Sequence, residues 1–455
     1  MSSSNAPQLD PAQNDDCPAV AAWLEHEFKP IPALEPFVLR IATESLDEGL
    51  RGQAWLAAGA IAHTQGNGEA AEERYRRGLA IAFGSETKTE RSACLNYALI
   101  CVNEGRVFET LALAARARDL AARHGAWEQL ALAHAYAARA LAELDEWEAS
   151  ERELTLAEEL LPRLSGRYEA YVGRVLALHR LPFAEHERDA ARVVSLCAAV
   201  IATLDADDEI GRAHLAVLAD CYRLPSDEAL AALEHALARF SFPVDLEGPM
   251  RVLEVELHAR EGRFDAAFAA ARVCLESLRR RRRDWVAVPQ ATCSSLQFRQ
   301  GRQLLRRLDA IAEHDGAADL YRETLDLVSE LTLHNIWDLD AFLRQLPQVK
   351  LTDPHYIAAL ERFRERSLAD FALLLDGLAA RLDIEATTVP ESDSRERQIC
   401  ICAWCHRLRG PDRLWLPLDD FEPPSAMSTI THGMCQECAA SVQERLPCND
   451  RRTST

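Results

Sequence analysis

Lysine is almost absent from this sequence. Only Lys29, Lys88 and Lys350 occur among its 51 basic residues, and the 72 acidic residues give a net charge of -21. A nucleic-acid-binding face needs positive charge to displace counterions from phosphates, and anionic lipid attracts basic segments in the same way. The acidity of the chain therefore argues against nucleic acid and against a membrane surface as partners.

Long apolar runs are missing too. No stretch approaches the roughly 18 uninterrupted apolar residues of a membrane-spanning helix. Residues 1–20 contain neither the basic segment nor the apolar segment of a secretory signal. We therefore expect a cytoplasmic protein, in which thiols stay reduced and disulfides are rare. Apolar residues make up 48% and charged residues 27%, which is typical of a globular chain.

The sequence also lacks the common catalytic signatures. It contains no G-x-x-x-x-G-K-[ST], no G-x-S-x-G, and no G-x-G-x-x-G after a plausible strand. His314-Asp315 is a pair found in metal-dependent phosphohydrolases, but no second His and Asp cluster completes such a site. The scattered carboxylates are typical of solvated helix faces. The sequence therefore predicts a protein that is not an enzyme.

Helical periodicity is what the sequence does contain. Between about residues 17 and 384, apolar residues recur every three or four positions and strand-like alternation is scarce. Similar turns recur along the first part, with the first three starting 39 and 40 residues apart. The turns start at Gly66, Gly105, Asp145 and Gly262, with two degenerate copies near 181–183 and 224–227. This spacing predicts an all-α array of helical hairpins.

The first hairpin carries a recognisable pattern of large and small residues. Trp55, Gly59, Ala71 and Tyr75 follow a large, small, small, aromatic order. With this pattern, residues 50–284 resemble the tetratricopeptide repeat, in a longer-helix variant found in bacterial signalling proteins. The resemblance implies a curved solenoid over residues 17–284 whose groove binds a protein or peptide.

The segment after the repeats is expected to remain helical. In residues 285–384, the stretch 300–335 predicts one or two amphipathic helices. The stretch 351–382 predicts a further pair that begins at Asp353-Pro354. The arginine run 279–283 is either a contact for an acidic partner or nucleic acid, or a solvated helix end. We favour the helix end, because cations are stabilising near the C-terminus of a helix.

The remaining boundaries follow from composition. Residues 385–398 are polar and contain Pro390, so they are predicted to be a linker. Residues 1–16 and 447–455 are predicted to be disordered. A cysteine-rich module is predicted over residues 399–446, between the linker and the disordered segment 447–455.

Cysteines cluster in this module. Six of the 13 cysteines lie within residues 400–455. Four of them form two C-x-x-C pairs, Cys402/Cys405 and Cys435/Cys438, separated by 29 residues. Zinc is bound by four such ligands in a tetrahedron, and a C-x-x-C turn supplies two of them. A module of this size buries little apolar surface, so a metal ion would supply part of its folding free energy. The sequence predicts a structural zinc ion held by the four cysteines, in an α+β or irregular module.

Two other chemistries use the same motif. Cys402-Ala-Trp-Cys405-His406 is the pattern that attaches c-type haem, which requires an export-linked maturation site and leaves the second pair unexplained. A redox pair requires a thioredoxin-like βαβ setting, of which the sequence shows no sign. Zinc is the interpretation that uses all four cysteines.

The tail also resembles a short module that is appended to many bacterial sensory and signalling proteins. The residues that carry this resemblance are Cys402, Trp404, Cys405, Arg407, Arg409, Trp415, Leu418, Phe421, His432, Gly433, Cys435 and Cys438. The sequence differs from the module at His406, where lysine is usual. The resemblance to this module implies a signalling context and no particular reaction. His432 either donates a hydrogen bond to a thiolate or replaces one cysteine as ligand.

The sequence as a whole predicts a non-enzymatic interaction scaffold or sensor in bacterial intracellular signalling. A redox- or metal-responsive regulator that acts through the zinc thiolates is the alternative. Nothing in the sequence identifies the partner.

Overall fold

The computed structural model describes residues 31–65, 67–164, 166–204, 208–242, 244–287, 295–311, 314 and 317–381, and four short strands between 398 and 433. The chain divides into two compact units. The first comprises Met1–Trp285 and Gln290–Phe371, and the second Val286–Pro289 and Ala372–Thr455. Each unit is described by itself.

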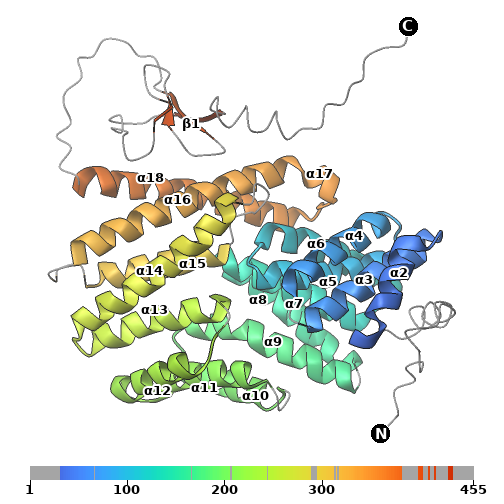
Figure 1. Ribbon diagram of the computed structural model, residues 1–455, viewed down its shortest axis with the longest axis horizontal. Coiled ribbons are helices and arrows are strands. Elements are labelled where there is room, and N and C mark those ends of the chain that lie inside the picture. The colour runs from blue at the N-terminus through green and yellow to red at the C-terminus, as the bar shows by residue number, and fades with distance from the viewer. Residues whose placement is uncertain are drawn as a thin grey trace. The chain divides into compact units, whose positions relative to one another are not determined.

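The first unit is helical throughout its described residues (Figure 1). Its elements are η2 (Pro32–Leu34), α2 (Glu35–Glu44), α3 (Glu48–Thr64), α4 (Gly68–Ala82), α5 (Lys88–Asn103), α6 (Val107–His124), α7 (Trp127–Glu143), α8 (Trp147–Leu160), η3 (Leu161–Arg163), α9 (Arg167–His186), α10 (Ala190–Ile201), α11 (Glu209–Arg223), α12 (Ser226–Arg239), α13 (Val244–Arg260), α14 (Phe264–Ala287), α15 (Ser295–Asp309), α16 (Ala317–Arg344), α17 (Leu346–Val349) and α18 (Pro354–Arg381).

Helices that follow one another pack together as pairs, and the pairs stack. The helix α3 packs on α4, α5 on α6, α7 on α8, and α9 and α11 both pack on α10. The prediction of stacked helical hairpins is therefore confirmed for this unit. None of the described helices is both long enough and apolar enough to cross a bilayer.

Four of the hairpin turns share one geometry. Gly105, Asp145, Arg188 and Gly262 all adopt left-handed backbone conformations, with φ of 72°, 58°, 55° and 68°. In each turn the next residue donates its N–H to a carbonyl five positions back, as Arg106 does to Cys101 at 2.8 Å. This is the Schellman arrangement that ends a helix and satisfies its last carbonyls. The second helix then begins two residues after the left-handed residue.

One predicted turn is wrong. Residues 181–183 lie inside α9, and the turn of that hairpin is at Arg188. Proline lacks the N–H that a helix interior needs, which normally ends a helix. Here packing outweighs that loss, because Leu181 and Phe183 are buried and the Phe183 ring meets Trp147 edge-on at 5.2 Å.

Small residues let paired helices approach closely. A Cβ added to Gly59 on α3 would lie 2.7 Å from a ring carbon of Tyr75 on α4. A Cβ on Gly78 of α4 would lie 2.8 Å from Leu56 of α3. Both distances are shorter than a normal carbon–carbon contact, so larger side chains would separate the two helices.

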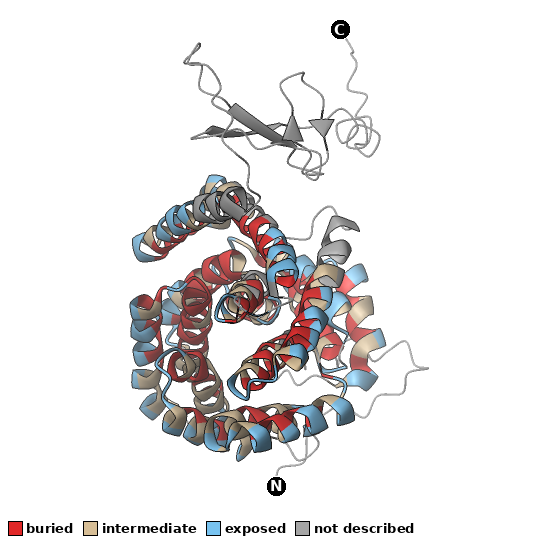
Figure 2. Ribbon diagram, turned by 90° about the vertical axis from the view of Figure 1, so that its left-hand side faces the viewer, coloured by how far each residue is buried: buried red, intermediate tan, exposed pale blue. Residues whose placement is uncertain are grey.

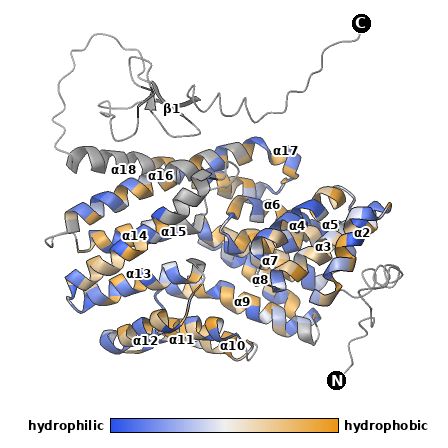
Figure 3. Cartoon of the chain, in the orientation of Figure 1, coloured by the Kyte–Doolittle hydropathy of each residue, from blue (hydrophilic) through white to orange (hydrophobic). Residues whose placement is uncertain are grey.

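Helix α7 is the most enclosed element of the described core. Every residue from Leu130 to Glu143 except Arg139 is buried. Elsewhere the buried sides of the helices face their neighbours and the exposed sides face outward (Figure 2). Hydrophobic and hydrophilic residues are correspondingly interleaved along each helix, as expected for amphipathic helices (Figure 3).

Later helices pack back on earlier ones. Phe108 of α6 contacts Phe342 of α16 and Phe363 of α18, with ring centroids 5.9 and 6.2 Å apart. The stretch 351–382 was expected to form two helices, but α18 runs through Pro354–Arg381 as one. Its predicted start is confirmed: Asp353 accepts the N–H of His355 at 2.8 Å and that of Tyr356 at 3.3 Å.

The described residues of the second unit beyond α18 form a four-stranded sheet of order β3-β2-β1-β4. The strands are β1 (Gln398–Cys402), β2 (Leu408–Arg409), β3 (Trp415–Leu416) and β4 (Thr429–Gly433). The strands β1, β2 and β3 pair antiparallel in sequence order, and β4 pairs with β1 in parallel.

Candidate functional site

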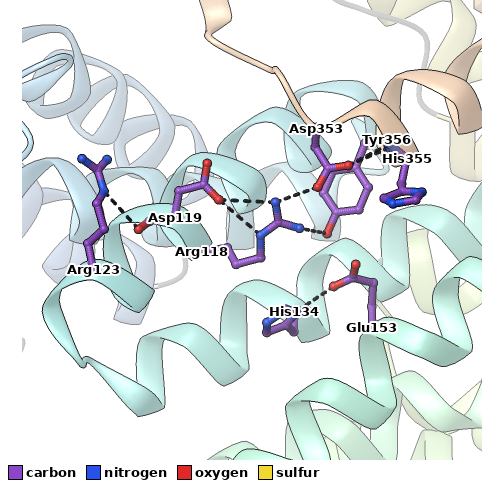
Figure 4. A network of polar contacts seen from close by, with 8 residues as sticks. All are labelled: Arg118, Asp119, Arg123, His134, Glu153, Asp353, His355 and Tyr356. Carbon is purple, nitrogen blue, oxygen red and sulfur yellow. Dashed lines mark hydrogen bonds and ion pairs between the residues drawn. The ribbon is translucent and has the colours of Figure 1, made fainter.

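Polar side chains join helices of the first unit that are far apart in sequence (Figure 4). Arg118 of α6 donates to Asp353 at 2.7 Å and to the hydroxyl of Tyr356 at 3.1 Å. Its guanidinium also lies 5.1 Å from the centre of the Tyr356 ring. Burial opposes ionisation of Asp353, but the hydrogen bond and charge of Arg118, together with the N–H groups of His355 and Tyr356, outweigh it and lower the pKa of this carboxyl.

A buried histidine–carboxylate pair lies beside this contact. His134 Nδ1 and Glu153 Oε2 are 2.6 Å apart, and the two residues are only 8% and 9% exposed. Burial raises the pKa of the nearby Tyr356 phenol well above its ordinary value, and the charge of Glu153 adds to this effect. The His134–Glu153 pair joins α7 to α8, while Arg118 holds α18 on α6.

Glu146 forms a second junction. This residue lies between α7 and α8 and is 8% exposed. It accepts hydrogen bonds from Arg362 at 2.5 Å and Arg366 at 2.7 Å, one turn apart on α18. Arg366 also donates to the carbonyl of Leu144 at 2.7 Å. Burial alone would raise the pKa of Glu146, but the two arginines lower it.

Glu143, at the end of α7, forms a third junction. Its Oε1 accepts from Arg139 at 2.6 Å and from Arg299 of α15 at 2.9 Å. Its Oε2 is buried and has no hydrogen-bond partner among the described residues. Burial opposes ionisation of Glu143, yet the two arginines keep its pKa below the ordinary value. The pKa of Arg299 is raised, chiefly by the charge of Glu143.

Two ionisable side chains of α9 lie near this junction. His179 Nδ1 lies 2.8 Å from the carbonyl oxygen of Ala135, and burial, helped by Arg139, lowers the pKa of His179 to about 3. The imidazole is therefore neutral at pH 7 and donates Nδ1–H to Ala135. Burial raises the pKa of Glu185, although Arg299 and Arg139 counteract this effect.

Ion pairs made by arginines of α15 connect this helix to both α7 and α13. At one end Arg299 binds Glu143 of α7, and further along Arg307 binds Glu256 of α13 at 2.5 Å. Between them, Gln300 lies so close to Gly248 of α13 that a Cβ there would be 2.5 Å from its oxygen. Helix α15, which contains four arginines and one aspartate, is thus paired with one glutamate of α7 and one glutamate of α13.

The sequence did not identify these charged junctions. The arginines of α15 and α18 recur at helical spacing, which indicates a face but not its partner. The only arginine of the 279–283 run with a described side chain, Arg279, pairs with Glu323 at 2.9 Å. His314 stacks on Phe264 with ring centroids 3.6 Å apart.

The predicted metal ligands fall largely outside the described residues. Cys405, Cys435 and Cys438 lie there, while Cys402 is the last residue of β1. Within the described part of the chain, no group of three or more His, Cys, Asp or Glu could hold a metal ion. His432 is in β4, where its Cα pairs with that of Ile401, and Gly433 pairs with Cys402.

This register allows a test of whether the predicted ligands fit one ion. Parallel pairing puts the ends of β1 and β4 at the same edge of the sheet, about 4.8 Å apart. Cys435 follows Gly433 by two residues, which span at most about 7 Å of chain. Four thiolates are a donor set that zinc prefers, so the chemistry of the predicted ligands fits a zinc ion. Their geometry is not shown, because Cys405, Cys435 and Cys438 lie outside the described residues.

Comparisons with family models and with curated proteins found no match to this chain.

Proposed function

We propose that this chain is a non-enzymatic scaffold that binds a protein or peptide partner in bacterial intracellular signalling. The observation that carries the proposal is the stack of helix pairs in the first unit. Such stacks present extended surfaces that bind segments of other proteins. The tetratricopeptide-like pattern at Trp55, Gly59, Ala71 and Tyr75 supports the same function, as does the resemblance of the tail to a signalling module.

The ionisable clusters of the first unit support binding rather than catalysis. Glu143, Glu146 and Asp353 are each held by arginines of another helix, and the His134–Glu153 pair is buried. These groups stabilise the stack. An enzyme would present such groups to a substrate.

Partner contact is expected on the helices that start successive pairs. The described residues expose six large apolar side chains, of which Tyr168 and Ile210 are 43% and 37% exposed. Tyr168 and Ile210 lie at the starts of α9 and α11, which are the first helices of two successive pairs. The helices α9 and α11 both pack on α10, and we propose that a bound segment contacts both side chains. Buried aromatic and apolar anchors often contribute a large share of the binding energy in protein interfaces.

We further propose that the second unit contains a structural zinc ion held by Cys402, Cys405, Cys435 and Cys438. The parallel register of β1 with β4 supports this proposal, because it brings together the points from which both C-x-x-C segments start. Bound zinc would supply folding free energy to a small unit.

Quantitative affinity capture tests the scaffold function. The full chain is compared with the Tyr168→Ser/Ile210→Ser variant and with Val273→Ser, which alters a residue on α14 that is 44% exposed. We expect the same set of proteins to be captured by the wild type and by Val273→Ser and to be depleted with the double variant. Equal capture by all three would reject this binding surface. Turnover of a small molecule by the purified chain would reject the scaffold function itself.

A further inference from the structure

Helix α15 presents a basic row and a buried row to the rest of the first unit. Arg299 and Arg307 are eight residues apart, in a row that recurs every four positions along the helix, and the adjacent row contains Gln300, Leu304 and Leu308. Both leucines are fully buried and Gln300 is 2% exposed. The helical rise places the two arginines about 12 Å apart along the axis. With this spacing, one helix can bind two separate carboxylates.

The carboxylates that bind α15 come from different helices. Glu143 of α7 binds Arg299 at 2.9 Å, and Glu256 of α13 binds Arg307 at 2.5 Å. Glu185 of α9 lies near Arg299, whose charge counteracts the rise in pKa that burial causes in this carboxyl. We call Glu143, Glu185 and Glu256 the acidic face. Three helices of the stack thus each place one carboxylate near the arginines of α15.

The contact of α15 with the acidic face leaves buried polar atoms unpaired. Glu143 Oε2 and Gln300 Nε2 are buried and have no hydrogen-bond partner in the part of the chain that the structure describes. Gln300 also lies so close to Gly248 of α13 that a Cβ there would be 2.5 Å from its side-chain oxygen. Unpaired buried groups cost free energy, which an occupant with better-placed donors and acceptors recovers. A different helix of the same character can therefore bind this face more favourably than α15 does.

We propose that α15 is a built-in ligand of the scaffold, and that the acidic face is the binding site for an arginine-bearing amphipathic helix of a protein partner, which displaces α15. This inference rests on the proposed scaffold function and specifies the chemistry of the partner. The partner helix repeats the spacing of Arg299, Leu304, Arg307 and Leu308. The negative net charge of the chain favours the approach of such a basic segment.

Displacement of α15 is a competition within one chain. Because α15 is tethered to the stack, its effective concentration at the acidic face is high. The apparent affinity of a partner is reduced by the small fraction of chains in which the face is free. A change that weakens the hold of α15 but keeps the three carboxylates should therefore tighten the binding of a helix added in trans.

A labelled peptide with the sequence of α15, residues 295–309, is the probe, and fluorescence anisotropy measures its binding to the full-length chain. The chain is tested as the wild type and as Arg299→Ala/Arg307→Ala, which keeps the carboxylates of the acidic face. The matched control is Arg306→Ala/Arg322→Ala, which removes the same charge from exposed positions of α15 and α16. A second peptide, which carries Arg299→Ala and Arg307→Ala itself, tests whether the arginines are recognised.

We expect the native peptide to bind the Arg299→Ala/Arg307→Ala chain at least about tenfold more tightly than the wild type or the control chain. The substituted peptide should bind that chain at least about tenfold more weakly than the native peptide does. Equal affinity of the native peptide for all three chains would overturn the role of α15 as a displaceable ligand. Equal affinity of the two peptides would overturn the recognition of arginine.

A milder variant covers the case in which the double variant does not fold, as checked by circular dichroism. Arg307→Ala removes one arginine of α15, while Glu256 keeps its ion pair with Arg260. The native peptide should still bind this variant more tightly than the wild type. An affinity no higher than that of the wild type would overturn the proposal in the same way.

The scaffold function fails differently from this inference. If the peptide binds no variant while protein capture still depends on Tyr168 and Ile210, the scaffold function stands and the role of α15 as a ligand is wrong. If the peptide binds as expected while capture is independent of Tyr168 and Ile210, the acidic face stands and the surface at those two residues is wrong.

Discussion

Arg118 and Asp353 form an ion pair at 2.7 Å although 235 residues separate them in the sequence. The same aspartate caps the start of α18, and the same arginine covers the ring of Tyr356. One contact therefore starts a late helix and attaches it to an early one.

Removing this contact should destabilise the first unit. We expect Arg118→Ala to lower the free energy of unfolding by about 2–3 kcal/mol, because it leaves a largely buried carboxylate without its partner. The measurement is urea unfolding at pH 7, followed by circular dichroism. Asp319→Asn breaks an exposed pair with Arg322 and should change stability by less than about 0.5 kcal/mol. Equal effects of the two changes would contradict the structural role of Arg118.

The low pKa of His179 predicts a loss of stability in mild acid. In the unfolded chain this imidazole titrates near 6.5, whereas burial lowers its pKa to about 3 in the folded chain. Between these values the unfolded state binds more protons, so the contribution of His179 is present above pH 6.5 and is lost as the pH falls. From pH 7 to 5 the loss should be about 2 kcal/mol.

An asparagine at this position tests the origin of the loss. Its side-chain amide can donate to the carbonyl of Ala135 as the imidazole does, but it does not titrate. Urea unfolding of His179→Asn at pH 7 and pH 5 should show a smaller difference than in the wild type. The control is His355→Asn, which changes an exposed residue and should retain the wild-type difference. If His179→Asn is as acid-sensitive as the wild type, the assignment to His179 is wrong.

Most of the turns that end the helices could be predicted from the sequence, because they depend on local residues. The turns at Gly105, Asp145 and Gly262 were predicted from their recurrence along the chain, and glycine and aspartate tolerate the left-handed backbone that ends a helix there. The turn at Arg188 was missed because no such residue marks it, and because Pro182 gave a misleading signal inside α9. The helix continues through Pro182 because Phe183 packs on Trp147.

Contacts between distant segments could not be predicted. The arginines at 299, 362 and 366 lie on amphipathic helices, but a single sequence does not show that Glu143 and Glu146 are their acceptors.

Close packing at Gly59 predicts a cost for a single methyl group. The Cβ of alanine would lie 2.7 Å from the Tyr75 ring, so α3 and α4 would have to separate or the ring would have to move. We expect Gly59→Ala to destabilise the protein by about 1–3 kcal/mol, although alanine favours helix formation. The control is Gly68→Ala at the start of α4, where a Cβ meets nothing within 4 Å. This change should be neutral or slightly stabilising, and thermal unfolding distinguishes the two variants.

Loss of zinc should affect the tail alone. In Cys402→Ser/Cys405→Ser we expect zinc content to fall below one equivalent by metal analysis. The thermal midpoint of the helical signal should stay unchanged, because the buried core of the first unit contains neither residue. Cys221→Ser should keep the zinc. Covalent haem absorbance in the wild type would reject the zinc site in favour of c-type haem.

Mild oxidation distinguishes a structural zinc ion from a regulatory one. Peroxide oxidises zinc thiolates and releases the metal, whereas the thiols of Cys94 and Cys197 are protected: burial raises the pKa of both to about 12, so little reactive thiolate forms. For a scaffold with structural zinc, we expect zinc release, measured with a chromogenic chelator, to leave partner capture by the helical unit unchanged. A parallel loss or gain of capture would instead establish the redox-responsive alternative. The Tyr168→Ser/Ile210→Ser variant then identifies the captured proteins that bind the helices. These proteins should be depleted with this variant both with and without peroxide.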